Sequence, residues 1–350
     1  MSPRPAAATG QGAATCQEGG ASIGTPVHGG PDALGAPRYD FSTNANACGP
    51  CPQALAAMQA ADRSHYPDPA YTSLRAALAC FHDVPAQRIV LAASASEFIH
   101  RISAYAARIG LRQAVLPAHG YGDYARAAQL WGLQPQVPGA DAGAALHWAC
   151  EPASPLGGAD GALACWLAHG AAPGALRVLD RAYAPLWLEG QPGAVAPDAW
   201  QLWTPNKALG LTGVRAAYAI APPGAEPVAA ALQALAPSWP VGADGVALLH
   251  AWVQPHAQAW LAQSLETLRG WKARQTALCA QLGWQVLPGS LANYFTARLP
   301  VADAAGTAAA LQRLRAQGIK LRDCASFGLP GCVRLGVLGP QAQQALARAW

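Results

Sequence analysis

Short apolar runs recur between residues 88 and 221 and predict buried β-strands. Most of these runs are continuous rather than alternating, which is typical of strands that helices cover on both faces. Patterns with a helical period lie between some of them, as at Ser96–Ile109 and Tyr124–Trp131. This alternation predicts an α/β fold with a mostly parallel sheet. The predicted strands are Arg88–Ala93, Gln113–Pro117, Ala145–Cys150, Leu176–Asp180, Trp200–Thr204 and Ala216–Ala221.

The pattern changes in the last third of the chain. An Ala-rich helical region runs from about Pro227 to Leu282, with interruptions expected at Pro237, Pro240 and Pro255. Beyond it, shorter strands and helices predict a small α+β unit. Its elements are strands at Tyr294–Leu299, Ile319–Arg322 and Cys332–Val337, with helices at Ala305–Ala316 and at the C-terminus.

These patterns divide the chain into three expected parts. Residues 1–26 hold one Ile and no Leu, Val or aromatic residue, so we expect a mobile tail there. An N-terminal arm and a large domain should occupy residues 27–284. A small C-terminal domain should occupy residues 285–350.

Composition and charge exclude several classes of function. Of the 350 residues 52% are hydrophobic, yet no stretch reaches the roughly 18 to 20 apolar residues of a membrane span. Lys and Arg (23) exceed Asp and Glu (19) only slightly and form no run, so we expect no nucleic-acid or membrane partner. The N-terminus lacks the Leu-rich core of a secretory signal. Nine irregularly spaced cysteines fit reduced thiols and a cytoplasmic location.

One cysteine pair has the spacing of a redox site. Cys48-Gly-Pro-Cys51 has the pattern of a thioredoxin dithiol, which normally follows a buried strand and begins a helix. Here it follows the polar, turn-rich segment Asp40–Asn46, so a redox function is the less favoured interpretation. A metal site is less favoured still, because no second pair or His partner has ligand spacing.

Candidate chemistry lies directly after the predicted strands, where α/β sheets bind ligands. Ser94-Ala-Ser96 begins a helix, so it is either an anion site or a plain helix cap. Asp180 ends a strand and is a candidate site carboxylate, a turn carboxylate or a helix N-cap. Lys207 is one of only three lysines and has no charged residue within seven positions. A desolvated lysine has a lowered pKa and becomes an amine nucleophile.

Several motifs together indicate a family. They are His28-Gly-Gly30, Tyr39–Asn46 with Gly49-Pro50, His65–Asp68, Asp180 with Tyr183, and Thr204–Arg215 around Lys207. From about Val27 onward the chain resembles the fold-type I pyridoxal-phosphate enzymes of the class II aminotransferase group. The first two motifs are most similar to the L-threonine-O-3-phosphate decarboxylases of cobalamin biosynthesis, and histidinol-phosphate aminotransferases are close cousins. The resemblance implies a large domain with a mostly parallel sheet and a small C-terminal α+β domain.

The resemblance also implies a role for each candidate residue toward pyridoxal 5′-phosphate. Lys207 would bind the cofactor covalently and later move the proton at the substrate's Cα. Asp180 would pair with the ring nitrogen, and Tyr183 would hydrogen-bond the 3′ oxygen. Ser154 stands where the family usually has an Asn that contacts this oxygen. The remaining cofactor residues would be Ser94, Ala95, Ser96, Thr204 and Arg215 around the phosphate, Tyr121 stacked on the ring, and Tyr66 reaching the cofactor phosphate of the second subunit in a homodimer.

For the substrate, the resemblance implies that Arg334 binds a carboxylate and that Arg322 and His28 bind a phosphate. The function it favours is decarboxylation of L-threonine O-3-phosphate to (R)-1-aminopropan-2-ol O-phosphate. One alternative is an aminotransferase of the histidinol-phosphate type. Another is a catalytically decayed interaction protein of the pathway, since Ser154 and Arg181 depart from the family pattern. No metal is implied.

Overall fold

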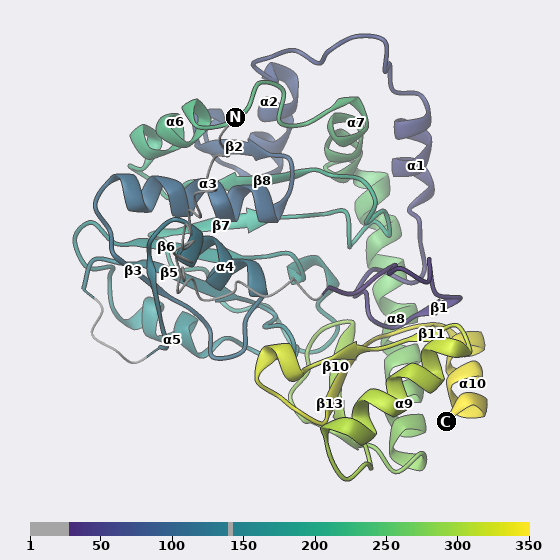
Figure 1. Cartoon of the computed structure of the whole chain (residues 1–350). Helices are drawn as coiled ribbons and strands as arrows, with labels where there is room; N and C mark the ends of the chain where they lie inside the picture. The colour runs from purple at the N-terminus through teal and green to yellow at the C-terminus, as the bar shows by residue number, and fades with distance from the viewer. Residues whose placement is uncertain (1–27, 139–142) are drawn as a thin grey trace, which may run out of the picture.

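Two lobes joined by one long helix make up the computed structural model, which describes residues 28–138 and 143–350 (Figure 1). The large lobe is a seven-stranded sheet with the helices that cover it. The small lobe is a four-stranded sheet with two C-terminal helices. The tail expected over residues 1–26 lies outside the described residues.

The large sheet has the strand order β2-β8-β7-β6-β5-β3-β4. Only β8 runs antiparallel to its neighbours, so the expected α/β class with a mostly parallel sheet is confirmed. Each predicted apolar run forms a strand. The edge strand β4 was not predicted, because its three residues include Pro135 and no apolar run. The strands are β2 (Ile89–Ala92), β3 (Gln113–Val115), β4 (Gln134–Gln136), β5 (Leu146–Cys150), β6 (Leu176–Asp180), β7 (Ala199–Trp203) and β8 (Ala217–Ile220).

Helices cover both faces of this sheet, which explains its continuous apolar strands. On one face Trp148 and Val178 pack in a buried cluster with Phe98 of α3. On the other face Ile89 and Tyr218 belong to a second, larger cluster. The first face is covered by α3 (Ala95–Arg108), α4 (Gly122–Leu130) and α6 (Glu226–Ala234), and the second by α2 (Thr72–His82), α5 (Gly161–Ala168) and α7 (Ala243–Trp252), with α1 (Pro52–Gln59) against α7.

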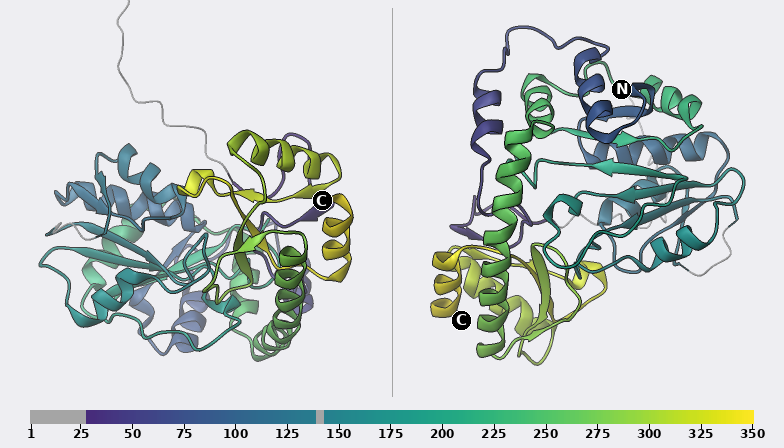
Figure 2. Two further views of the ribbon diagram at one scale, coloured as in Figure 1. Left: turned by 90° about the horizontal axis from the view of Figure 1, so that it is seen from below. Right: turned by 180° about the vertical axis from the view of Figure 1, so that it is seen from behind.

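Helix α8 (Pro255–Gln281) runs along both lobes, as the rear view of Figure 2 shows. An interruption was expected at Pro255, but the helix begins there instead. Proline suits the first helical position, because that residue's N–H needs no partner within the helix. The buried Leu268 of α8 lies in a cluster that also contains Tyr218 of the large lobe and Leu335 of the small lobe. One continuous core therefore joins the lobes.

The small lobe has the strand order β12-β13-β10-β9. The single strand expected over Ile319–Arg322 is in fact two strands with different partners. β11 pairs in parallel with β1, which belongs to the N-terminal arm, and β12 pairs with β13. The elements are β1 (Tyr39–Asp40), β9 (Gln285–Val286), β10 (Tyr294–Arg298), α9 (Ala304–Ala316), β11 (Ile319–Lys320), β12 (Arg322–Asp323), β13 (Cys332–Gly336) and α10 (Pro340–Ala349).

Among the described residues, no helix combines the length and the apolar character that crossing a membrane requires.

The shared core predicts that the lobes unfold together. Replacing Leu268 with Ala removes a fully buried side chain and should lower the free energy of unfolding by about 2 to 5 kcal/mol. Chemical denaturation followed by circular dichroism should still show one transition, at lower denaturant. Leu130→Ala is the matched control, because that side chain is 49% exposed. Two separate transitions in the Leu268 variant would contradict a common core.

Candidate active site

A cavity of about 740 Å³ lies at the carboxyl edge of the large sheet and reaches the small lobe. The sheet topology brings the candidate residues together there. Strands β2, β5, β6 and β7 end at this edge. The antiparallel β8 begins at it, so Arg215, which comes just before β8 in the sequence, also lies there. Of the candidates, only Tyr66 does not line this cavity. The lining includes His28, Ser94, Ala95, Ser96, Tyr121, Ser154, Asp180, Tyr183, Thr204, Lys207, Arg215, Arg322 and Arg334.

The N-terminus of α3 forms one end of the cavity. Ser94 is the N-cap, and its hydroxyl accepts a hydrogen bond from the Glu97 backbone N–H at 3.1 Å. Ser94 is therefore a helix cap that also borders the cavity. The Thr204 hydroxyl oxygen is buried nearby in the same lining and has no partner among the described residues. A helix N-terminus, an unpaired hydroxyl and the Arg215 guanidinium together suit a phosphate group.

Asp180 is a carboxylate held almost completely away from water, with 4% of its surface exposed. Its Oδ1 accepts a hydrogen bond from the Ala182 backbone N–H at 2.9 Å, and its Oδ2 accepts one from the Tyr124 hydroxyl at 2.6 Å. Burial raises the pKa of Asp180, while these two hydrogen bonds and the charge of Lys207 act in the opposite direction. Such a carboxylate is suited to pair with a cationic ring nitrogen.

Lys207 is the only one of the three lysines that lines the cavity. Its Nζ lies 5.2 Å from the centre of the Tyr183 ring. The other two lysines are engaged elsewhere. Lys272 Nζ pairs with Glu189 at 2.7 Å, and Lys320 Nζ donates to the Gly30 carbonyl at 2.6 Å. The structure therefore offers one amine to a ligand in the cavity.

The loop that carries Cys48 and Cys51 supports the Lys207 segment. The Asn46 backbone N–H donates to the Lys207 carbonyl at 2.9 Å, and the Cys51 N–H donates to the Leu209 carbonyl at 2.8 Å. Both cysteines are free thiols, and burial raises the pKa of Cys48. Reactive dithiols need a lowered pKa, so this environment does not favour a redox function.

Two arginines face the cavity from neighbouring strands of the small lobe. Arg322 of β12 and Arg334 of β13 are directly paired across the ladder. Arg334 donates to the Ser154 hydroxyl at 2.8 Å and to the Ser42 carbonyl at 2.9 Å, and no carboxylate of the described residues pairs with it. Arg322 donates to Ser326 and stacks on Phe327. Burial, and then the charge of the neighbouring Arg334, lower the pKa of Arg322. An anion bound between the two guanidinium groups would stabilise their charged forms.

The two aromatic candidates, Tyr121 and Tyr66, lie in different hollows of the protein. The Tyr121 hydroxyl is 3.2 Å from the Ser96 hydroxyl inside the cavity, and its ring centre lies 6.0 Å from that of His28 at the mouth. Tyr66 is 77% exposed and stacks on Trp239. It borders a separate surface hollow that Arg215 also lines. Within one subunit, Tyr66 does not join the other candidates.

Two of the cavity residues that sequence reasoning missed have a clear physical role or an unmet hydrogen-bonding need. Tyr124, which holds Asp180, belongs to the same Tyr121-Gly-Asp-Tyr124 segment as the stacking candidate, and that segment was the available signal. Asn44 is 1% exposed and lines the cavity, and neither its Nδ2 nor its Oδ1 has a partner among the described residues. An unpaired buried amide is costly, so Asn44 is a candidate ligand contact. Its signal was the Tyr39–Asn46 motif.

Comparisons with known proteins agree with this arrangement. The family model described as "Aminotransferase class I and II" matches residues 168–349. A histidinol-phosphate aminotransferase of Bradyrhizobium diazoefficiens is 32% identical over 303 residues, which cover 81% of this chain and 83% of that protein.

Two solved structures share the fold. The histidinol-phosphate aminotransferase of Sinorhizobium meliloti, in complex with pyridoxal-5′-phosphate, has a TM-score of 0.74 at 22% identity over 88% of both chains. The L-threonine-O-3-phosphate decarboxylase of Porphyromonas gingivalis has a TM-score of 0.66 at 21% identity, over 84% of this chain and 90% of that one.

The fold and the cavity define a pyridoxal-phosphate-dependent enzyme of fold-type I. The chain belongs to the aminotransferase class I and II family. The residues present fit the cofactor, because the helix N-terminus and the unpaired Thr204 hydroxyl suit its phosphate and the buried Asp180 suits its ring nitrogen.

The position of Lys207 predicts where the cofactor attaches. Borohydride reduction of the holoenzyme should fix pyridoxal phosphate to one peptide, which contains Lys207, because the other two lysines are paired outside the cavity. Peptide mapping by mass spectrometry measures this directly. Lys207→Arg should lose both the label and the yellow colour. A label on Lys272 or Lys320 would overturn the assignment.

The hydrogen bond from Tyr124 predicts a change in the pH dependence of cofactor binding. In Tyr124→Phe, Asp180 loses a donor to its charged form, so its pKa rises further and it becomes protonated at a higher pH. Cofactor affinity should fall by roughly 10- to 150-fold, as for loss of about 1.5 to 3 kcal/mol.

Spectroscopic titration with pyridoxal phosphate at several pH values measures the effect. On acidification, the variant should lose affinity at a higher pH than the wild type. Tyr105→Phe is the control, because Tyr105 packs beside the same core without lining the cavity. The same pH dependence in the wild type and in Tyr124→Phe would mean that Tyr124 does not act on Asp180.

Proposed function

We propose that this enzyme transfers an amino group between a small phosphorylated amine and a 2-oxo acid, as in transamination of the histidinol-phosphate type. The curated relatives support this reaction, which was the alternative in the sequence analysis, over decarboxylation. The observation that carries the proposal is the pair of guanidinium groups, Arg322 and Arg334, side by side at the cavity. An aminotransferase binds an amine in one half-reaction and an acid in the other, and both arginines suit phosphate and carboxylate oxygens.

The cofactor end of the cavity is proposed to act through fixed contacts. Pyridoxal phosphate, when bound, draws off the electrons of the bond broken at the substrate's Cα. Asp180 keeps the ring nitrogen protonated, and Tyr183 hydrogen-bonds the 3′ oxygen. The Lys207 amine moves the proton at the substrate's Cα. The cofactor phosphate is held by Ser94, Ala95, Ser96, Thr204 and Arg215, and the ring is covered by Tyr121.

The substrate end of the cavity is proposed to recognise the negative charges of the substrate. Arg334 binds a carboxylate, and its contact with Ser154 at 2.8 Å orients the guanidinium. The resemblance assigns the Ser154 position to the 3′ oxygen of the cofactor, and the hydrogen bond from Arg334 gives this serine a substrate-side role as well. Arg322 and His28 bind the phosphate. Because the two guanidinium groups repel each other, an anionic substrate relieves an unfavourable interaction already present in the free enzyme.

Decarboxylation of L-threonine O-3-phosphate in cobalamin biosynthesis is the second candidate. The observation that favours it is that His28 and Gly29 line the cavity, because His28-Gly-Gly30 is one of the two motifs on which the decarboxylase resemblance depends. Decarboxylation needs the Cα–carboxylate bond perpendicular to the cofactor ring, whereas transamination needs the Cα–H bond there. Arg334 could favour either orientation. A decayed, non-catalytic protein is disfavoured, because Lys207 and Asp180 both line the cavity.

We also propose a homodimer. Tyr66 is exposed and stands at a hollow that shares Arg215 with the cavity. In a dimer, Tyr66 of each subunit would reach the cofactor phosphate of the other.

A product assay tests the proposed reaction. The holoenzyme should transfer the amino group of histidinol phosphate only when a 2-oxo acid is present, and chromatography of the amino acid formed measures this. Release of CO2 from L-threonine O-3-phosphate without any acceptor would favour the second candidate instead. Inertness toward both phosphorylated compounds would refute the substrate class.

Arg322→Ala refines the same assay. The variant should lose roughly 10- to 150-fold in kcat/KM for the phosphorylated substrate and little for its unphosphorylated analogue, because a charge-assisted contact of about 1.5 to 3 kcal/mol is lost. Arg313→Ala, on the exposed side of α9, is the matched control. Equal losses for both substrates would mean that Arg322 does not read the phosphate.

A further inference from the structure

The N-terminal segment of residues 28–44, called the strap below, is bound to the small lobe although it precedes the large lobe in sequence. Its strand β1 pairs with β11, and the Gly336 backbone N–H of β13 donates to the Phe41 carbonyl at 2.7 Å. The N-terminal end of the strap places His28 in the lining of the cavity, beside Tyr121 of the large lobe. The strap therefore carries one candidate substrate residue on the lobe that holds the other two.

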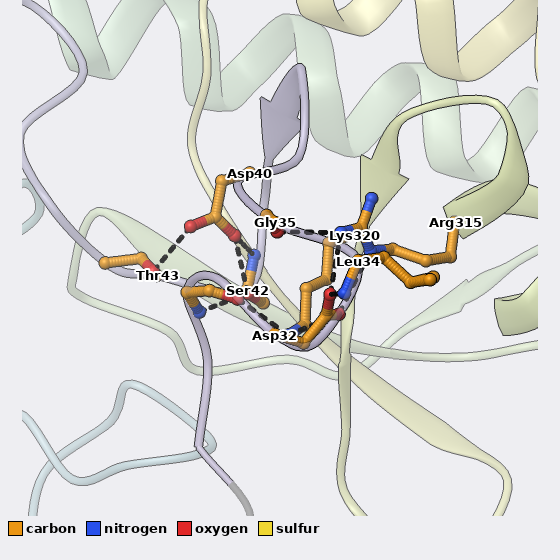
Figure 3. A network of polar contacts seen from close by, with 9 residues as sticks. Asp32, Leu34, Gly35, Asp40, Ser42, Thr43, Arg315 and Lys320 are labelled. Atoms are coloured by element: carbon orange, nitrogen blue, oxygen red, sulfur yellow. Dashed lines mark hydrogen bonds and ion pairs between the residues drawn. The ribbon is translucent and has the colours of Figure 1, made fainter.

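Asp32 fixes the outer part of the strap (Figure 3). Its carboxylate accepts two hydrogen bonds from Arg315, at 2.7 and 3.0 Å, and pairs with Lys320 at 3.0 Å. Arg315 also donates to the Gly35 carbonyl at 2.8 Å, and Lys320 donates to the Gly30 carbonyl at 2.6 Å. A single exposed ion pair contributes little, but a bidentate arginine with a second cation and two backbone contacts fixes geometry well.

Ser42 fixes the inner part of the strap. Its hydroxyl donates to Asp40 and accepts a hydrogen bond from the Gly30 backbone N–H at 2.8 Å, and its carbonyl accepts one from Arg334 at 2.9 Å. Gly29 lies so close to this residue that a Cβ atom would stand 2.2 Å from the Ser42 carbonyl oxygen. Gly30 has a φ of +91°, which L-residues with a side chain rarely adopt. Both glycines are therefore required for the path that leads to His28.

We propose that Asp32 is a positioning residue for substrate recognition: through Arg315, Lys320 and the glycine pair, it holds His28 where the substrate phosphate binds. Asp32 itself is absent from the cavity lining and acts only through the strap. The inference rests on the proposed function, which assigns the phosphate to Arg322 and His28. It adds that phosphate specificity depends on a contact outside the site.

The substitution Asp32→Asn tests this in the holoenzyme. It keeps the size of the side chain and removes the charge that both cations bind. KM for the phosphorylated substrate should rise about ten-fold while kcat and bound cofactor stay unchanged, because a contact remote from the reacting carbon is lost equally in the ground state and transition state. Asp303→Asn, at the start of the same α9 that carries Arg315, is the control and should change neither constant.

A double-mutant cycle with His28→Ala makes the test specific. If Asp32 acts through His28, Asp32→Asn should add nothing in the His28→Ala background. Additive losses, or an unchanged KM in Asp32→Asn, would overturn the inference and leave the proposed function standing. If His28→Ala alone changes nothing, the phosphate role of His28 in the proposed function fails first.

A second variant covers the case in which Asp32→Asn does not fold. Gly29→Ala changes no charged residue, and its Cβ atom would push residue 29 away from the Ser42 carbonyl. It should raise KM for the phosphorylated substrate in the same way, and it should also be silent in the His28→Ala background. An effect of Gly29→Ala that persists without His28 would overturn the inference.

Discussion

A carboxylate kept from water at the end of β6 is the constraint on which the active site depends. Burying a charge is expensive unless it is paired, and the Asp180 carboxylate receives two hydrogen bonds and the influence of Lys207 from the described residues. The remaining cost favours a ligand with a cationic nitrogen. The sheet places β6 between β5 and β7, and helix α4 brings Tyr124 to Asp180, so both elements hold this carboxylate at the cavity.

The local pattern of the sequence predicted much of this arrangement. The buried strands are continuous apolar runs, so their ends could be located, and Asp180 and Lys207 followed from those ends. Pairings between distant segments left no such pattern. The Tyr124–Asp180 hydrogen bond joins residues 56 positions apart, and β1 pairs with β11, which lies about 280 residues further along the chain. The strand β4 was missed because it is short and contains Pro135.

The proposed function divides recognition between the two lobes. In that proposal the large lobe supplies nearly all the groups around the cofactor, whereas Arg322, Arg334 and the strap, which bind the substrate, belong to the small lobe. Substitutions in the small lobe can therefore change which substrate enters without disturbing Asp180 or Lys207. This division gives a physical reason why one fold supports both amino-group transfer and decarboxylation in related proteins.

The strap also has a consequence for folding of the protein during its synthesis on the ribosome. Asp32 and Arg315 are 283 residues apart, so their contact closes a loop that contains most of the chain. Closing a loop of this size carries an entropic cost, and contacts of such high sequence separation form slowly. The strap is synthesised early, yet strand β11, with which it pairs, and the cations Arg315 and Lys320 are synthesised near the end. The strap can therefore bind the small lobe only after residues of the last tenth of the polypeptide have emerged.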